Sequence, residues 1–152
     1  MNTQIYGTKF TKKRTIGDFE WMIQQPEYKN SLFIFNDNEE HHLTMIRGGG
    51  NAVIRPFNKY NQNLEKPLSA GIPTGTMMKG GYDFLTTDVE RTIDATLNEI
   101  IELIKKYNYD AIYYSVGSNN KLGTGLFKVD QNVINYIDQK IQLLSTKQTI
   151  YL

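Results

Sequence analysis

The spacing of apolar residues predicts two amphipathic helices in the second half of the chain. The first runs from about Asp88 to Tyr107, with apolar residues three and four positions apart, and Thr87 and Glu90 have capping-box spacing at its start. We expect Asp130 to cap the second helix. The predicted buried faces consist of Val89, Ile93, Leu97, Ile100 and Ile104, and of Val133, Ile134, Ile137, Ile141 and Leu144.

Continuous apolar segments predict buried strands between and before these helices. Residues 31–35 are apolar from Leu32 onward without alternation, which is typical of a strand covered on both faces in a parallel sheet. Residues 109–115 follow the long helix directly, as in half of a βαβ unit. Residues 70–75 form a short apolar segment that ends in turn residues. The pattern therefore predicts an α/β fold with strands ending at Phe35, near Thr74 and at Ser115.

Several shorter segments leave alternatives open. Residues 4–16 fit an edge strand or a pair of strands, and residues 19–25 a short helix that Asp18 caps and Pro26 stops. Residues 52–57 fit either a helical turn or a short strand, since Pro56 limits both. Residues 145–152 either fray or add an edge strand. The length of 152 residues indicates one domain.

Composition argues against several kinds of partner and chemistry. The net charge is +1, from 17 basic and 16 acidic side chains, so no strong field points to a nucleic acid or a membrane surface. The lack of cysteine excludes disulfides, thiolate catalysis and cysteine-bound zinc. No apolar run approaches the roughly 18 residues of a membrane span, and the N-terminus has no secretory pattern. We therefore expect a cytoplasmic protein.

Loops of small polar residues follow all three predicted strand ends. They begin at Asn36, Thr74 and Val116, and the first leads into Gly48–Gly50. Ligands of open α/β sheets bind outside the carboxyl ends of the strands, so we expect one pocket there. Consecutive glycines expose peptide N–H groups, and a helix starting near Asn51 would favour an anion. A phosphate-bearing ligand is predicted, against the alternative of surface loops without a ligand.

The order of these motifs resembles that of macrodomains, α/β modules that bind ADP-ribose and related nucleotides. The likeness spans about residues 16–144 and includes an element known from macrodomain-like proteins of phages and bacteria. It implies a three-layer fold with a central mixed, mostly parallel sheet, and, for a phage protein, a place in the host cytoplasm. The matching motifs are Gly17-Asp-Phe19, Phe35-Asn-Asp-Asn38, Gly48-Gly-Gly50, Ile72-Pro-Thr-Gly75 and Gly123-Thr-Gly-Leu-Phe127.

The resemblance also implies a set of site residues. Asp18 would accept a hydrogen bond from the adenine amino group, against the alternative of a plain helix cap. Asn36, Asp37 and Asn38 are the catalytic candidates, and each has an alternative role within its own turn. The expected ligand contacts also include two arginines suited to phosphate, together with loop residues: Arg47, Gly48, Gly49, Gly50, Asn51, Arg55, Thr74, Gly75, Ser115, Gly117, Gly123, Thr124, Gly125 and Phe127.

His41 and His42 lie beside Glu39 and Glu40 and suggest acid–base or metal chemistry. Adjacent histidines on a loop are usually surface residues, and this spacing matches no metal signature. No metal and no cofactor is therefore predicted.

Three functions remain open at this point. The first, which we favour, is a module that binds an ADP-ribose-like nucleotide without turning it over, because it needs only glycine loops, arginines and amides. The second is a hydrolase that removes ADP-ribose from a protein or a small molecule. The third is a structural or interaction protein whose glycine loops are merely flexible. A homo-oligomer in which a neighbouring subunit completes the pocket is compatible with each.

Overall fold

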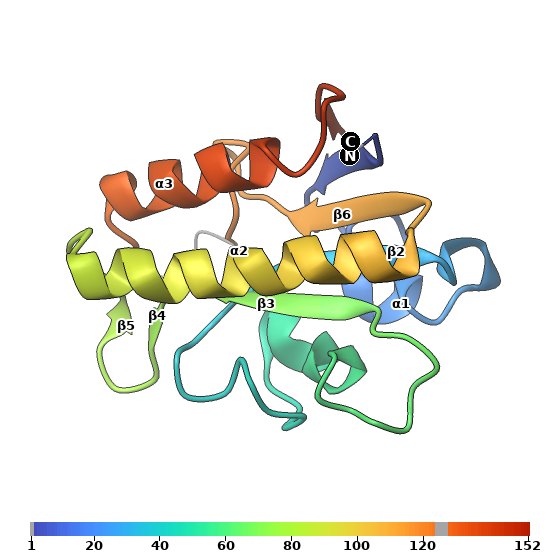
Figure 1. The fold of residues 1–152 in the computed structure, drawn as a ribbon, viewed down its shortest axis with the longest axis horizontal. Helices are drawn as coiled ribbons and strands as arrows, with labels where there is room; N and C mark the ends of the chain where they lie inside the picture. Colours follow the sequence, from blue (N-terminus) through green and yellow to red (C-terminus); the bar gives the residue numbers. More distant parts are fainter. Residues whose placement is uncertain (1, 124–127) are drawn as a thin grey trace.

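A five-stranded parallel sheet forms the centre of the molecule in the computed structural model, which describes residues 2–123 and 128–152 (Figure 1). The strand order is β3-β2-β6-β1-β7, and each neighbouring pair is parallel. A separate antiparallel hairpin follows β3. The strands of the sheet are β1 (Gln4–Thr8), β2 (Ser31–Asp37), β3 (Ser69–Pro73), β6 (Ala111–Ser115) and β7 (Ile150–Tyr151), and those of the hairpin are β4 (Gly75–Thr76) and β5 (Gly80–Gly81).

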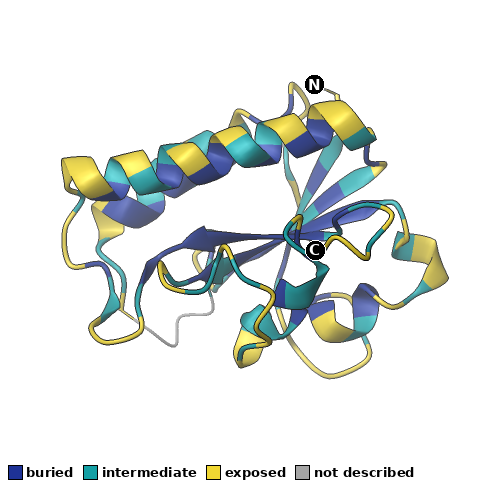
Figure 2. Cartoon of the chain, turned by 60° about the horizontal axis from the view of Figure 1, so that its bottom comes forward, coloured by how far each residue is buried: buried dark blue, intermediate teal, exposed yellow. Residues whose placement is uncertain are grey.

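Helices cover both faces of this sheet, which confirms the predicted three-layer α/β class (Figure 2). On one face, α2 (Thr87–Tyr107) and α3 (Gln131–Gln142) pack on Leu32 and Ile34. On the other, α1 (Phe19–Met22) and the 3₁₀ helix η2 (Gly50–Phe57) pack on Phe33 and Phe35. Alternate residues of β2 thus enter opposite cores, which is why the segment is apolar throughout.

The two predicted amphipathic helices are confirmed, with all ten residues of their apolar faces buried. The capping-box prediction was wrong by one residue. The cap of α2 is Thr86, whose hydroxyl accepts a hydrogen bond from the Val89 N–H at 3.2 Å, and Thr87 is already helical. Asn108 caps the C-terminal end of the helix and adopts a left-handed conformation with φ of 52°. Within the described residues, no helix combines the length and apolar character needed to cross a membrane.

The structure also decides between the alternatives that the sequence left open for the shorter segments. β1 is paired on both sides, because the tail adds β7 as the edge strand beyond it. Asp18 caps α1 by accepting from the Trp21 N–H at 3.3 Å, and the 3₁₀ helix η1 (Pro26–Tyr28) begins at the proline expected to stop α1. Residues 52–57 belong to η2, the helical alternative.

Partly buried tyrosines predict an alkaline limit to stability. The Tyr60 hydroxyl lies 3.1 and 3.0 Å from the two carboxylate oxygens of Glu99. Burial, the charge of Glu99 and this hydrogen bond raise the pKa of Tyr60 from 10.0 to about 12. Burial, with smaller contributions from Tyr28 and Tyr6, also raises the pKa of Tyr113 to about 12. The folded state therefore holds these phenolic protons more tightly than the unfolded state.

This stabilisation is complete below about pH 10 and is lost as the pH rises toward 12. The free energy of unfolding, measured with urea, should decrease as the pH rises across this range. The decrease should be less steep for Tyr60→Phe, because this variant has one tyrosine with a raised pKa fewer. Equal slopes for wild type and Tyr60→Phe would contradict the assignment to Tyr60.

Candidate functional site

The carboxyl ends of β2 and β3 open into a cavity of about 620 Å³, within the usual size range of small-molecule sites. Asn36, Asp37 and Thr74 form its floor. One wall, the glycine wall, consists of residues 46–52, and the other, the hairpin wall, of residues 75–77, 80 and 81. The cavity thus lies at the edge of the sheet where the strand ends predicted a pocket.

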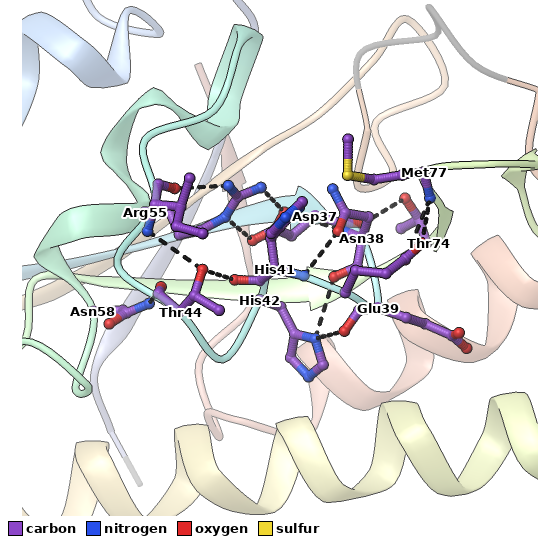
Figure 3. Close-up of polar contacts among 12 residues, drawn as sticks. Asp37, Asn38, Glu39, His41, His42, Thr44, Arg55, Asn58, Thr74 and Met77 are labelled. Carbon is purple, nitrogen blue, oxygen red and sulfur yellow. Dashed lines mark hydrogen bonds and ion pairs between the residues drawn. The ribbon is translucent and has the colours of Figure 1, made fainter.

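A buried ion pair fixes the floor of the cavity to the glycine wall (Figure 3). Arg55 donates from Nε to Asp37 Oδ2 at 2.9 Å and from Nη2 to Asp37 Oδ1. Its Nη1 donates to the Ile46 carbonyl at 2.7 Å. The two side chains are only 3% and 1% exposed, although both residues border the cavity. Arg55 therefore directs its guanidinium into the protein and ties η2 and the glycine wall to the end of β2.

The structure explains the presence of glycine differently at the three glycine positions of the glycine wall. A Cβ atom at Gly48 would lie 2.8 Å from Ala52 Cβ and 3.1 Å from Arg55 Nη1, so this residue must be small. Gly50 has a φ of 55°, which favours glycine. Gly49 has φ of −91° and ψ of 169°, and its Cβ would meet no described atom within 4 Å. The fold of the described residues therefore accounts for Gly48 and Gly50 but not for Gly49.

The turn after β2 is held by its own side chains. Asn38 Oδ1 accepts from the His41 N–H at 2.9 Å, and the Asn38 N–H donates to Asp37 Oδ1 at 2.8 Å. The Thr74 N–H donates to the Asp37 carbonyl at 2.9 Å. Asn36 Oδ1 accepts from Asn51 Nδ2 at 3.2 Å, joining the floor to the glycine wall. Asp37 and Asn38 are therefore engaged in shaping the site.

The hairpin wall is anchored to the same turn. The Glu39 N–H donates to the Gly75 carbonyl at 3.0 Å, and the Tyr82 hydroxyl donates to Glu39 Oε1 at 2.6 Å. Burial and this hydrogen bond raise the pKa of Tyr82. The Met77 N–H donates to the Glu40 carboxylate at 3.0 Å (Figure 3). The end of β2 thus positions the glycine wall, and the turn that follows β2 positions the hairpin wall.

A second cavity of about 250 Å³ adjoins the first, and Asn36 and Thr74 line both. It lies between the loop after β6 and the start of α3, with Lys121 and Lys128 in its lining. Lys121 Nζ donates to Asn135 Oδ1 at 2.6 Å. The two cavities form neighbouring compartments along the carboxyl edge of the sheet, and the second brings cationic groups to that edge.

Most of the predicted site residues border these two cavities. The predicted residues that line the first cavity are Asn36, Asp37, Asn38, Arg47, Gly48, Gly49, Gly50, Asn51, Arg55, Thr74 and Gly75. Those that line the second are Asn36, Thr74, Gly117 and Gly123. Thr124, Gly125 and Phe127 lie outside the described residues. The cavity linings do not include Asp18 or Ser115.

The residues set apart from the cavities have other surroundings. Asp18 caps α1 and also accepts from the Arg14 N–H at 2.8 Å. Ser115 and its neighbour in the sheet, Thr8, have buried hydroxyls without a hydrogen-bond partner in the described part of the chain. Arg47 borders the large cavity but forms an exposed ion pair with Glu20 at 2.9 Å.

Some cavity residues were missed by the sequence prediction. Ile46 and Met77 line the cavity, but an apolar residue within a loop carries no signal for binding. Gly80 and Gly81 also line the cavity, and they were not among the residues predicted to contact a ligand. His41 lines the cavity and was considered for acid–base chemistry. In residues 2–123 and 128–152, no three His, Cys, Asp or Glu side chains are grouped so that they would hold a metal ion.

Comparisons with known proteins show a partial similarity to an enzyme that acts on a nucleotide. No protein-family model and no solved structure matches the chain. NAD kinases from two strains of Lactobacillus delbrueckii subsp. bulgaricus are 36% identical to it over 70 residues. The match covers 45% of this chain and 26% of each NAD kinase, so the chain corresponds to about a quarter of their length. The similarity that these comparisons show is thus to part of an NAD kinase and not to a macrodomain.

Proposed function

We propose that this protein binds a phosphate-bearing nucleotide, ADP-ribose or a related molecule, in the 620 Å³ cavity. The observation that carries the proposal is the bare backbone of the glycine wall. Gly49 has an extended conformation that any residue can adopt, and no described atom lies within 4 Å of where its Cβ would be, yet the residue has no side chain. A ligand pressed against this backbone accounts for the glycine, because a methyl group would occupy the ligand's place.

The polarity of the glycine wall suits a phosphate group. The first N–H groups of a helix have no carbonyl partner within that helix, and η2 begins at Gly50 beside the cavity. Backbone N–H groups in such a position attract anions. Lys121 and Lys128 add positive charge in the neighbouring cavity, where a second part of an extended ligand would lie. The partial similarity to NAD kinases supports a ligand of the same chemical class.

Binding is favoured over hydrolysis by the state of the proposed catalytic residues. The Asp37 carboxylate accepts hydrogen bonds from Arg55 and from the Asn38 N–H, and its side chain is buried. A general base needs a lone pair directed at its substrate. We therefore assign Asp37 and Arg55 to the framework of the site, and Asn36, which lines both cavities, to ligand contact.

A thermal-shift panel tests the proposal with ADP-ribose, NAD, ATP, cyclic ADP-ribose isomers and cyclic dinucleotides, with and without a divalent metal. A ligand at about 100 times its dissociation constant should stabilise the protein by about 2.7 kcal/mol, raising the melting temperature by a few degrees. A selective shift by ADP-ribose-like compounds is expected. A flat panel with folded protein would overturn the proposal.

Gly49→Ala gives two expected effects of opposite sign. Because the position is extended and open, the substitution should stabilise the free protein by about 0.4–1 kcal/mol. It should nevertheless weaken binding of the shifting nucleotide about tenfold, since the added methyl group would meet the ligand. Calorimetric titration measures the affinity, and Gln62→Ala, at an exposed position outside the cavity lining, serves as control. Unchanged affinity in Gly49→Ala would place the ligand elsewhere.

A further inference from the structure

Ile46 and Met77 are large apolar side chains left exposed on the two walls of the large cavity. Ile46 stands at the start of the glycine wall and is 57% exposed, and Met77 stands in the turn of the hairpin wall and is 62% exposed. Large apolar side chains that line a cavity and are left exposed provide a surface that a ligand can cover.

The backbones of both residues are held in place by the polar framework of the site. The Ile46 carbonyl accepts from Arg55 Nη1 at 2.7 Å, and Arg55 is itself paired with Asp37. The Met77 N–H donates to the Glu40 carboxylate at 3.0 and 3.3 Å (Figure 3). Because these backbones are already held in place, the two exposed side chains can contact a ligand with little loss of conformational entropy on binding.

We propose that Ile46 and Met77 hold the planar ring of the nucleobase between them, while the phosphate lies against Gly48–Gly50. This assignment rests on the proposed nucleotide function and adds the part of the ligand that each wall recognises. A ring offers two apolar faces to such side chains, and the thioether of methionine makes favourable contacts with aromatic rings. A phosphate or sugar group between these two apolar side chains would lose its hydrogen bonds to water without gaining others in return.

The neighbours of both residues provide matched controls. Met45 precedes Ile46 and is 48% exposed, and Met78 follows Met77 and is 95% exposed. Neither methionine is among the described residues that line the cavity. Substitutions there change the same kind of exposed apolar side chain on the same segment without touching a ligand in the cavity.

Calorimetric titration with ADP-ribose tests the assignment. Ile46→Ser and Met77→Ser should each weaken binding about tenfold, with melting temperatures of the free protein near that of wild type. Ile46→Leu and Met77→Leu, which keep an apolar side chain of similar volume, should bind within about threefold of wild type. Met45→Ser and Met78→Ser should bind as wild type does. Ribose 5-phosphate, which lacks the ring, should compete equally well in wild type and the serine variants.

The outcomes separate the two proposals. If wild type binds neither ADP-ribose nor any nucleotide of the panel, the proposed function fails and this assignment fails with it. If wild type binds and the Ile46 and Met77 serine variants bind equally well, the assignment alone is overturned. It is also overturned if the Met45 and Met78 variants lose as much affinity as the Ile46 and Met77 serine variants. The same holds if ribose 5-phosphate competes less well in the Ile46 and Met77 serine variants than in wild type.

Discussion

Replacing Arg55 by methionine is expected to destabilise the protein by about 3–5 kcal/mol, because the substitution leaves a buried carboxylate without its counter-charge. Arg55 and Asp37 are 3% and 1% exposed and share two hydrogen bonds. The third contact of the guanidinium holds the Ile46 carbonyl, so the glycine wall should loosen as well. Urea unfolding measures the change in the free energy of unfolding.

Two further variants show whether the loss arises from the unpaired charge. Asp37→Leu combined with Arg55→Met removes both charges, and should recover much of the stability lost in the single variant. Arg47→Met breaks the exposed pair with Glu20, in which the side chains are 63% and 56% exposed, and should cost less than about 1 kcal/mol. An Arg55→Met variant as stable as Arg47→Met would contradict the buried-pair interpretation.

The second large effect is expected from Gly75→Ala, which should abolish ligand binding while the central sheet stays folded. A Cβ atom at Gly75 would lie 2.1 Å from the Gly80 carbonyl oxygen and 2.7 Å from Gly81 Cα, so the hairpin would have to open. This hairpin forms one wall of the cavity and is separate from the five-stranded sheet. Such overpacking typically costs about 1–3 kcal/mol.

Gly80→Ala is the matched control within the same hairpin. Gly80 has a φ of 78°, and its Cβ would meet no described atom within 4 Å, so alanine there adds backbone strain of about 1–2 kcal/mol without a clash. Thermal unfolding and calorimetric titration of both variants separate the two effects. Gly80→Ala should keep measurable binding. Wild-type affinity in Gly75→Ala would show that the hairpin wall takes no part in the site.

The parts of the fold that follow from local periodicity were predictable from the sequence. The apolar faces of α2 and α3 and the buried segment from Leu32 to Phe35 lie in the core, because their spacing reflects burial directly. The pairing of β1 with β6 and β7 joins segments more than 100 residues apart, and no local pattern specifies it. The cap of α2 moved to Thr86 because two adjacent threonines offer the same hydroxyl.

The environment of individual site residues was harder to predict. The sequence placed Asp37 and Arg55 in one site as separate groups, one for catalysis and one for phosphate. Their mutual neutralisation depends on η2 folding back over the end of β2, which residue types alone do not reveal. Ile46 and Met77 escaped notice for a related reason, since apolar loop residues are indistinguishable in sequence from core residues until their exposure is known.

The most direct test of the central claim is an amide NMR titration of the protein with ADP-ribose, which reports on each backbone N–H separately. Saturable shifts are predicted at Gly48, Gly49, Gly50 and Asn51 and at residues 75–77, 80 and 81, in the two walls of the cavity. Absence of saturable shifts, or shifts confined to amides away from both walls, would contradict the account.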